Sequence, residues 1–171
     1  VPKTVTTIGS SDFANCTSLK TVIFEEGSKL TTVGASAFKA SGIESITFPE
    51  GVTTFTTVKT PNVTTSNTLF MDCVNLKSVT FGSKTTFLAK QMFKGCIALE
   101  TIDIPDTVKM IGAECFKDCT NLKSINFNET SKLEKIGESC FANSGLESIS
   151  LPASFTKFGV GSSYSSAVGS S

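Results

Sequence analysis

The chain has 171 residues and no net charge at pH 7, because 15 basic residues, all of them lysines, balance 15 acidic ones. A neutral chain without arginine is a poor candidate for nucleic acid, which requires clustered positive charge and arginine contacts to bases. The sequence also lacks histidine, the side chain most used as a general base and as a metal ligand. No apolar run approaches the about eighteen residues of a membrane helix, and no targeting segment is visible, so we expect no membrane insertion of this fragment.

The first residues open in the middle of a repeated unit. Val1-Pro2 align with Ile104-Pro105 and Phe48-Pro49, which end later units. Residues 19–55 also resemble residues 122–158, and extending that match places the partner of Phe70 beyond the last residue. We therefore expect the chain to be a fragment of a longer array.

One unit of about 23 residues is repeated along the whole chain. It reads Leu-x-x-Ile-x-Phe, then a short polar stretch, and then Ile-Gly-x-x-x-Phe-x-x-Cys. The leucine position is occupied by Leu19, Ile43, Leu76, Leu99, Leu122 and Leu146. This period and leucine pattern predict a leucine-rich-repeat solenoid, in which each coil contacts only its neighbours. We predict a single array of about six repeats over residues 1–171.

Each unit begins with a predicted strand. The alternation in Leu-x-x-Ile-x-Phe indicates a short strand of a parallel sheet on the concave face, with Ile and Phe pointing inward. A proline ends the strand in several units, as at Pro105, because proline has no amide hydrogen for the ladder. A second inward pair follows, such as Val108 and Ile111, and then a glycine that we expect at a turn. The Phe-x-x-Cys segment crosses the outer side, where we predict one helical or 3₁₀ turn.

Phenylalanine dominates the predicted core. Thirteen of the 14 phenylalanines fall at inward positions, and the exception is Phe87, displaced by one from Leu88. The phenylalanine before the cysteine position is Phe13, Phe38, Phe70, Phe93, Phe116 or Phe141. We expect these rings to form one continuous stack, each burial contributing roughly 1.5–3 kcal/mol.

The six cysteines are predicted to be buried thiols. Cys16, Cys73, Cys96 and Cys119 share one position, which serine fills in the other two units, and Cys115 and Cys140 precede the stacked phenylalanine. Interchange with serine, alanine and methionine favours a small packed side chain, although an even count also suits disulfides. A zinc site would need four converging thiolates, and a catalytic cysteine would lack its usual basic partner. We expect no metal, no cofactor and no enzymatic activity.

Two columns of small polar side chains are predicted to face out from the strands. The third position of each strand segment holds Thr21, Ser45, Ser78, Thr101, Ser124 and Ser148, and the fifth holds Ile23, Thr47, Thr80, Asp103, Asn126 and Ser150. Curved solenoids commonly bind through this face, so the candidate partner-binding residues are Thr21, Ile23, Thr47, Thr80, Asp103 and Asn126. The alternative is that serine and threonine simply suit solvated strands.

The second strand position alternates in charge between successive units. It holds Lys20, Glu44, Lys77, Glu100, Lys123 and Glu147. Parallel strands about 4.8 Å apart would set each lysine beside a glutamate. We interpret these pairs as a device that keeps the coils in register, with a binding role as the weaker alternative.

One unit carries an insertion, which we place over residues 56–68. Insertions in repeats form loops that often bind partners, so Lys59 and Asn62 are further candidates. The alternative is a surface loop tolerated at little cost in stability. Residues 159–171 form a second, Gly/Ser-rich segment that we interpret as a tail or the start of another insertion.

With these residues identified, the unit resembles the BspA-like, or Treponema pallidum-type, leucine-rich repeat. Leu99-Glu-Thr-Ile102-Asp-Ile104-Pro105, followed by Ile111-Gly112-Ala-Glu-Cys-Phe116-Lys-Asp-Cys119, carries the resemblance. It covers the chain from Val1 to about Phe158. It implies a surface or secreted protein of bacteria or protists that adheres to host matrix proteins or to other cells. It implies no site residues, because the motif is structural.

Two functions follow as hypotheses. The first is a non-catalytic, extracellular or cell-surface interaction module that binds a protein or glycan on a host or neighbouring cell. The second is an assembly element that associates with copies of itself through the ends or edges of the solenoid.

Overall fold

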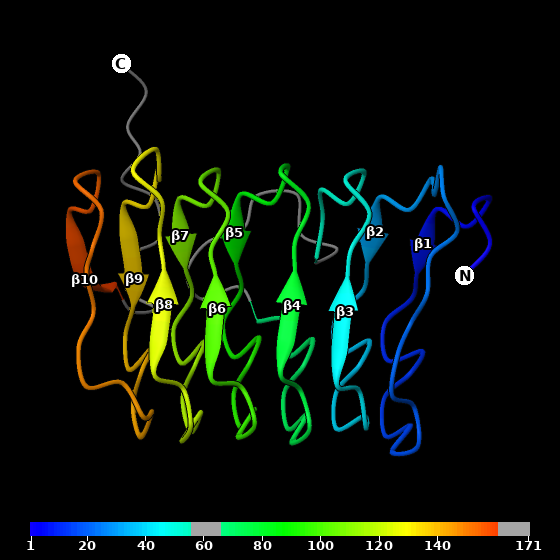
Figure 1. Cartoon of the computed structure of the whole chain (residues 1–171), viewed down its shortest axis with the longest axis horizontal. Coiled ribbons are helices and arrows are strands. Elements are labelled where there is room, and N and C mark those ends of the chain that lie inside the picture. The colour runs from blue at the N-terminus through cyan, green and yellow to red at the C-terminus, as the bar shows by residue number, and fades with distance from the viewer. Residues whose placement is uncertain (56–65, 161–171) are drawn as a thin grey trace.

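The structure is a computed structural model that describes residues 1–55 and 66–160. It is a parallel β-solenoid whose coils lie side by side along the long axis, with a strand sheet on each of two opposite faces (Figure 1). We number the coils 1 to 6 by the six phenylalanines of the predicted stack. The predicted fold class, a β-dominated leucine-rich-repeat solenoid, is confirmed.

The first sheet contains the strands predicted from the leucine pattern. It consists of two hydrogen-bonded pairs that lie side by side and that we together call the first sheet: β3 (Ser45–Thr47) with β4 (Ser78–Thr80), and β6 (Thr101–Asp103) with β8 (Ser124–Asn126). β3 pairs with β4 and β6 pairs with β8, in parallel, so that equivalent residues of two coils lie opposite each other. The middle residue of each strand is buried and the last is exposed. The predicted inward and outward alternation is therefore confirmed.

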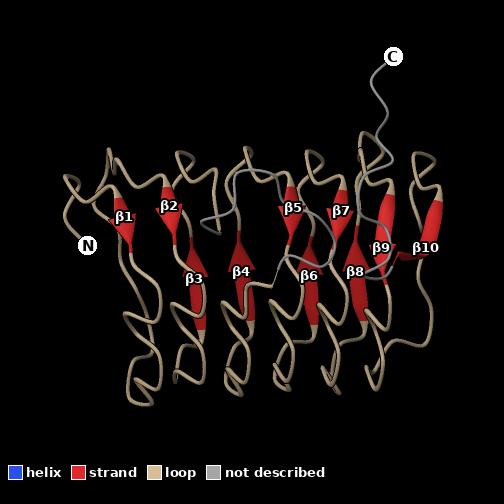
Figure 2. Cartoon of the chain, turned by 180° about the vertical axis from the view of Figure 1, so that it is seen from behind, coloured by secondary structure: helices blue, strands red, loops and turns tan. Residues whose placement is uncertain are grey.

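The second sheet lies on the opposite face and its strands run the other way (Figure 2). It consists of β1 (Thr7–Ile8) paired with β2 (Thr32–Val33), and of a larger group ordered β10-β9-β7-β5. The larger group comprises β5 (Phe87–Leu88), β7 (Met110–Ile111), β9 (Lys135–Gly137) and β10 (Lys157–Val160). The sequence pattern identified the buried residues here, such as Ile111, but not the strands, because strands of two to four residues are too short for alternation to be visible.

The six phenylalanines form the predicted stack through the core. Neighbouring ring centroids are 5.3, 5.6, 5.5, 5.2 and 6.0 Å apart from Phe13 to Phe141, and no pair of planes is inclined by more than 17°. Phe38, Phe70, Phe93 and Phe116 are fully buried. Phe48 and Phe81 add a second aromatic contact, with centroids 6.1 Å apart.

The outer segments are turns, so the predicted helical or 3₁₀ turn is not what the structure contains. No helix occurs in residues 1–55 or 66–160. Hydrogen bonds close successive turns, as from the Cys96 amide to the Phe93 carbonyl at 3.0 Å. The residues two before and two after the stacked phenylalanine mostly have positive φ, as at Gln91 (61°) and Gly95 (77°). Left-handed residues at both positions interrupt the right-handed path that a helix requires.

In three coils the glycine after the second inward pair serves close packing rather than a turn, whereas Gly159 at the same position has a positive φ of 71°, as predicted for a turn. Gly112 does not have a positive φ. A Cβ on Gly112 would lie 2.6 Å from the carbonyl carbon of Ala89 in the preceding coil, and Gly34 and Gly137 meet the backbone of their neighbours in the same way. The coils are therefore stacked more closely here than any side chain would permit.

Two phenylalanines differ from expectation. Phe87, predicted to be the exception, is buried beside Met110 in the second sheet. Phe158, predicted to point inward, is 54% exposed, because its strand β10 is at the end of the described sheet and has a neighbour on one side only.

Candidate partner-binding surface

The outward residues of the first sheet form one continuous face, which we call the strand face. It contains the third and fifth strand positions identified from the sequence. Five of the predicted partner-binding residues, Thr21, Thr47, Thr80, Asp103 and Asn126, are exposed on it. Ile23 lies on the same face and is 78% exposed. Lys59 and Asn62 lie outside the described residues.

Hydrogen bonds between neighbouring strands hold part of this face in place. Asn126 Nδ2 donates to Asp103 Oδ1 at 2.7 Å, and Ser124 Oγ donates to Thr101 Oγ1 at 3.0 Å. Asp103 and Asn126 lie directly opposite each other in the ladder between β6 and β8. These hydrogen bonds therefore hold the side chains in fixed positions on the face.

The predicted charge ladder is present in part of the strand face. Glu44 contacts Lys20 at 3.3 Å and Lys77 at 3.2 Å, and Glu100 contacts Lys123 at 3.2 Å. The hydrogen bond from Lys77, followed by that from Lys20, lowers the pKa of the Glu44 carboxyl. In the described chain, the pairs Lys77–Glu100 and Lys123–Glu147 are not within 4 Å.

Surface cavities lie at both ends of the strand face. Near coil 1, two adjoining cavities of about 390 and 380 Å³ lie between residues 21–28 and residues 45–51. Near coil 6, a smaller cavity of about 270 Å³ lies between residues 123–127 and 148–150. The first region is lined by aromatic and acidic side chains, and the second mainly by serine, asparagine and lysine.

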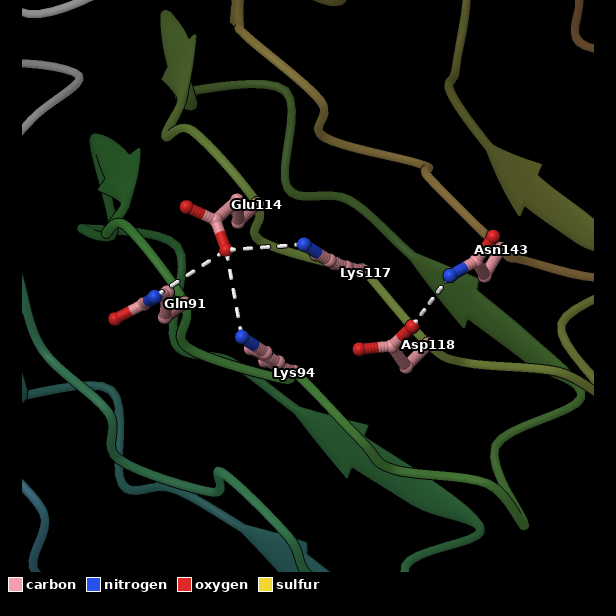
Figure 3. Close-up of polar contacts among 6 residues, drawn as sticks. All are labelled: Gln91, Lys94, Glu114, Lys117, Asp118 and Asn143. Carbon is pink, nitrogen blue, oxygen red and sulfur yellow. Dashed lines mark hydrogen bonds and ion pairs between the residues drawn. The ribbon is translucent and has the colours of Figure 1, made fainter.

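A second polar cluster lies on the outer turns and was not identified from the sequence. Glu114 Oε2 accepts a hydrogen bond from Gln91 at 3.3 Å and lies 3.4 Å from Lys94 Nζ and 3.7 Å from Lys117 Nζ (Figure 3). Partial burial raises the pKa of Glu114, but the hydrogen bonds from Gln91 and Lys94 and the lysine charges outweigh this effect and lower it. Because its Oε2 oxygen contacts residues of its own and the preceding coil, we interpret the cluster as a clamp between coils.

The buried cysteine thiols have little capacity for chemistry. All six are free, and all except Cys16 are buried, so the prediction of buried thiols is confirmed for five. Cys96 Sγ donates to the Phe70 carbonyl at 3.0 Å, and Cys119 Sγ to the Phe93 carbonyl at 3.1 Å. Burial raises the pKa of Cys119 to about 12. Thiols with such values are protonated, and therefore unreactive, at neutral pH.

Within residues 1–55 and 66–160, no group of three or more cysteines and acidic residues has the arrangement of a metal site. In that same part of the chain, no helix has the length and hydropathy needed to cross a bilayer.

Parallel coils, an inward leucine ladder and a polar strand face define a leucine-rich-repeat protein. Comparison with known proteins identifies the particular class of repeat. The family described as "BspA type Leucine rich repeat region" matches in six copies over residues 1–59 and 54–167. The chain belongs to this family.

Solved structures of similar proteins come from bacteria. A leucine-rich repeat protein of Bacteroides ovatus is 30% identical with a TM-score of 0.78, covering 93% of this chain and 38% of that one. One of Eubacterium ventriosum is 25% identical with a TM-score of 0.74, covering 93% and 40% respectively. The leucine-rich repeat protein of T. pallidum, 20% identical with a TM-score of 0.67 over 92% and 64% of the chains, shares the fold. The chain thus spans about two-fifths of the first two proteins, and no curated protein matches it.

Proposed function

We propose that this array is a non-catalytic interaction module, displayed on a cell surface or secreted, that binds a protein or glycan through its strand face. The observation that carries the proposal is the row of exposed polar side chains on β3, β4, β6 and β8. Part of this row is held by hydrogen bonds between strands, as between Asp103 and Asn126. Extended repeat surfaces of this kind are used by solenoid proteins to bind partners.

Two further observations support a binding role over a catalytic one. The sequence has no histidine, and burial raises the pKa of the Cys73, Cys96, Cys115, Cys119 and Cys140 thiols. The location outside the cell rests on membership of the BspA-type family, whose members are typically surface or secreted proteins.

The test begins with a screen of the chain against immobilised matrix proteins and glycans. The best partner is then measured against the variant Thr80→Arg/Asn126→Arg, which places two bulky cations on the strand face. Thr7→Arg is the matched control, because Thr7 is an exposed strand threonine of the opposite sheet. Binding should weaken about ten-fold or more in the double variant and stay unchanged in the control. Equal affinity of all three proteins would reject the strand face as the binding surface.

If the strand face is rejected, the inserted segment is the next candidate surface. Deleting residues 56–65 and measuring the same partner tests whether Lys59 and Asn62 belong to the binding site. If the partner no longer binds the deletion variant but binds Thr80→Arg/Asn126→Arg with unchanged affinity, its binding site lies in the insertion.

A second candidate function is association with copies of the same chain through the ends of the solenoid. It is favoured by the end rings: Phe13 and Phe141 each stack on one neighbour in the series of six and are only partly buried. Light scattering over a range of concentrations separates the two functions. A constant monomer mass in a protein that still binds its partner rejects self-association.

A further inference from the structure

Coil 1 and coil 2 share fewer ladder contacts along the strand face than coil 2 and coil 3 do. Coil 1 contributes no strand to the first sheet in the described residues, and it meets β3 there at an isolated bridge between Thr21 and Ser45. β3 and β4, by comparison, pair at three successive positions. The space left between residues 21–28 and 45–51 forms the two adjoining cavities near coil 1, which share Phe24 and Thr47. We call this groove the N-terminal wedge.

The floor of the wedge is apolar where the rest of the strand face is polar. Ile23 occupies the fifth strand position, which is Thr47, Thr80, Asp103, Asn126 or Ser150 in the other coils. Its side chain is 78% exposed and lines the groove. Beside it, the Phe24 and Phe48 rings are inclined by 38° with centroids 6.3 Å apart, whereas Phe48 and Phe81 are inclined by only 20°. The wedge thus offers an apolar contact that no described strand covers.

The rim of the wedge is acidic. Its lining contains Glu25, Glu26 and Glu50 and no lysine. Ser83 donates to Glu50 Oε2 from its backbone amide at 2.8 Å and from its hydroxyl at 2.7 Å, and these bonds lower the pKa of that carboxyl. Among the described residues, no lysine ammonium lies within 4 Å of these three carboxylates. Glu25 Oε2 also accepts a hydrogen bond from the Lys3 backbone amide at 3.0 Å, and the charge of Lys84 acts on Glu50. The rim nevertheless carries three carboxylates without an ion pair in the described chain, so it favours a basic partner.

We propose that the N-terminal wedge binds an extended peptide segment in which an apolar side chain is flanked by lysine or arginine. The inference rests on the proposed binding function and names a partner class for one part of the strand face. The peptide would lie along the groove, its apolar side chain on Ile23 and Phe24 and its cations beside Glu25, Glu26 and Glu50. The apolar contact would supply affinity, and the acidic rim would favour basic partners.

The choice of occupant follows from the chemistry of the groove. An acidic peptide would place like charges beside three carboxylates, which opposes association. The groove near coil 6, lined mainly by polar residues, has neither an exposed isoleucine nor an acidic rim. It therefore serves as an internal comparison for the wedge.

The test uses two labelled peptides, acetyl-Lys-Val-Lys-Val-Lys-amide and its counterpart with glutamate in place of lysine. Fluorescence anisotropy should show saturable binding of the lysine peptide only, and this binding should weaken as salt is raised from about 50 to about 300 mM. In two-dimensional NMR spectra, shifts should concentrate in residues 21–28 and 45–51. Absent binding, equal binding of both peptides, or shifts centred elsewhere would overturn the proposal.

Variants test whether the peptide binds specifically at the wedge or non-specifically to any exposed apolar residue. Ile23→Thr, which installs the residue of the neighbouring coils, should lower the affinity about ten-fold, and Glu25→Gln/Glu26→Gln should remove most of the salt dependence. Val74→Thr is the control, because Val74 is an apolar residue 47% exposed on another part of the molecule. An effect of Val74→Thr as large as that of Ile23→Thr would reject the wedge.

The experiments distinguish rejection of the wedge proposal from rejection of the proposed strand-face function. Thr80→Arg/Asn126→Arg should leave binding of the lysine peptide unchanged, because neither residue lines the wedge. If the peptide does not bind but that variant still weakens the screened partner, the wedge alone is rejected. If the peptide binds through Ile23 but the screened partner binds Thr80→Arg/Asn126→Arg with unchanged affinity, the broader strand-face proposal is rejected.

Discussion

The rings of Phe93 and Phe116 lie almost parallel, inclined by 3°, with their centroids 5.2 Å apart. Both rings are fully buried, and they belong to successive coils. Each also stacks on a second ring, Phe70 in one case and Phe141 in the other. The core is therefore a chain of contacts between nearest neighbours, and its stability depends on where along the stack a ring is removed.

Removal of a central ring should be more destabilising than removal of an end ring. Phe93→Ala should lower the free energy of unfolding by about 3–5 kcal/mol, because it leaves a cavity between two stacked rings. Phe13→Ala should cost less, since Phe13 is only partly buried and stacks on Phe38 alone in the series of six. Urea unfolding followed by circular dichroism measures both. Equal losses would contradict the nearest-neighbour description of the core.

The buried hydroxyl of Thr85 should lower the stability of the fold, because it has no hydrogen-bond partner. Thr85 is fully buried, and its Oγ1 makes no hydrogen bond. It occupies the inward position that valine fills at Val108 and Val52. Thr85→Val should raise the unfolding free energy by about 1 kcal/mol, because the cost of burying an unpaired hydroxyl disappears. Thr86→Val, at an exposed neighbour, is the control, and a loss of stability at position 85 would show that the hydroxyl has a partner.

The close approach of coils 4 and 5 should make Gly112 intolerant of a side chain. Gly112→Ala should destabilise the fold by roughly 1–3 kcal/mol, because the new methyl group overlaps the backbone of Ala89 and Lys90. Gly9→Ala is the matched comparison at the equivalent position of coil 1. The atoms nearest to its methyl group would belong to the flexible Asp12 side chain, starting at 2.9 Å, and not to backbone. Thermal unfolding measures both variants. Equal decreases in their unfolding midpoints would argue against steric overlap at Gly112.

Stability should decrease at alkaline pH through the buried thiols. Burial raises the pKa of Cys119 to about 12, so the folded state keeps a proton that the unfolded state releases from about pH 9. The contribution of this thiol is complete below pH 9 and is lost as the pH rises toward 12. Cys119→Ser should reduce the slope of the unfolding free energy against pH between about 9 and 11. Serine is suitable because Ser41 and Ser144 occupy this position in coils 2 and 6. Urea midpoints at each pH measure this slope, and identical slopes would remove Cys119 as a source.

Thiol labelling should distinguish one cysteine from the other five. Cys16 is exposed at the first coil, whereas Cys73, Cys96, Cys115, Cys119 and Cys140 are buried. A chromogenic disulfide reagent should therefore modify Cys16 rapidly in the native protein and the remainder only after unfolding. Cys16→Ser supplies the control, which should abolish the rapid phase. Rapid reaction of a second thiol in the native protein would contradict the described packing.

The sequence was sufficient to predict the architecture because each coil repeats the same inward positions. The stacked phenylalanines, the exposed strand columns and the pairing of Glu44 with two lysines all follow from residue types at fixed spacing. What the pattern did not predict are features set by backbone geometry. Examples are the left-handed residues at Gln91 and Glu114 and the close coil contact at Gly112.

The candidate site was predicted only in part for a related reason. Periodicity indicates which side chains face outward, and it correctly placed Thr47, Thr80 and Asn126 on one face. It does not report the shape of the surface between neighbouring coils, so the wedge beside Ile23 was not visible. The isoleucine in a polar column was the one signal that pointed to it.

The ladder of coil 3 resumes immediately beyond the inserted residues. Thr54 still bridges to Thr32, Ser66 bridges to Lys90, and the Phe38 amide donates to the Leu69 carbonyl at 3.0 Å. Length variation at this corner is thus decoupled from the aromatic column, and foreign sequences spliced between Phe55 and Ser66 should leave the surrounding scaffold intact. The array is accordingly a natural carrier for grafted epitopes or reporter peptides, displayed at a defined point beside an unchanged framework.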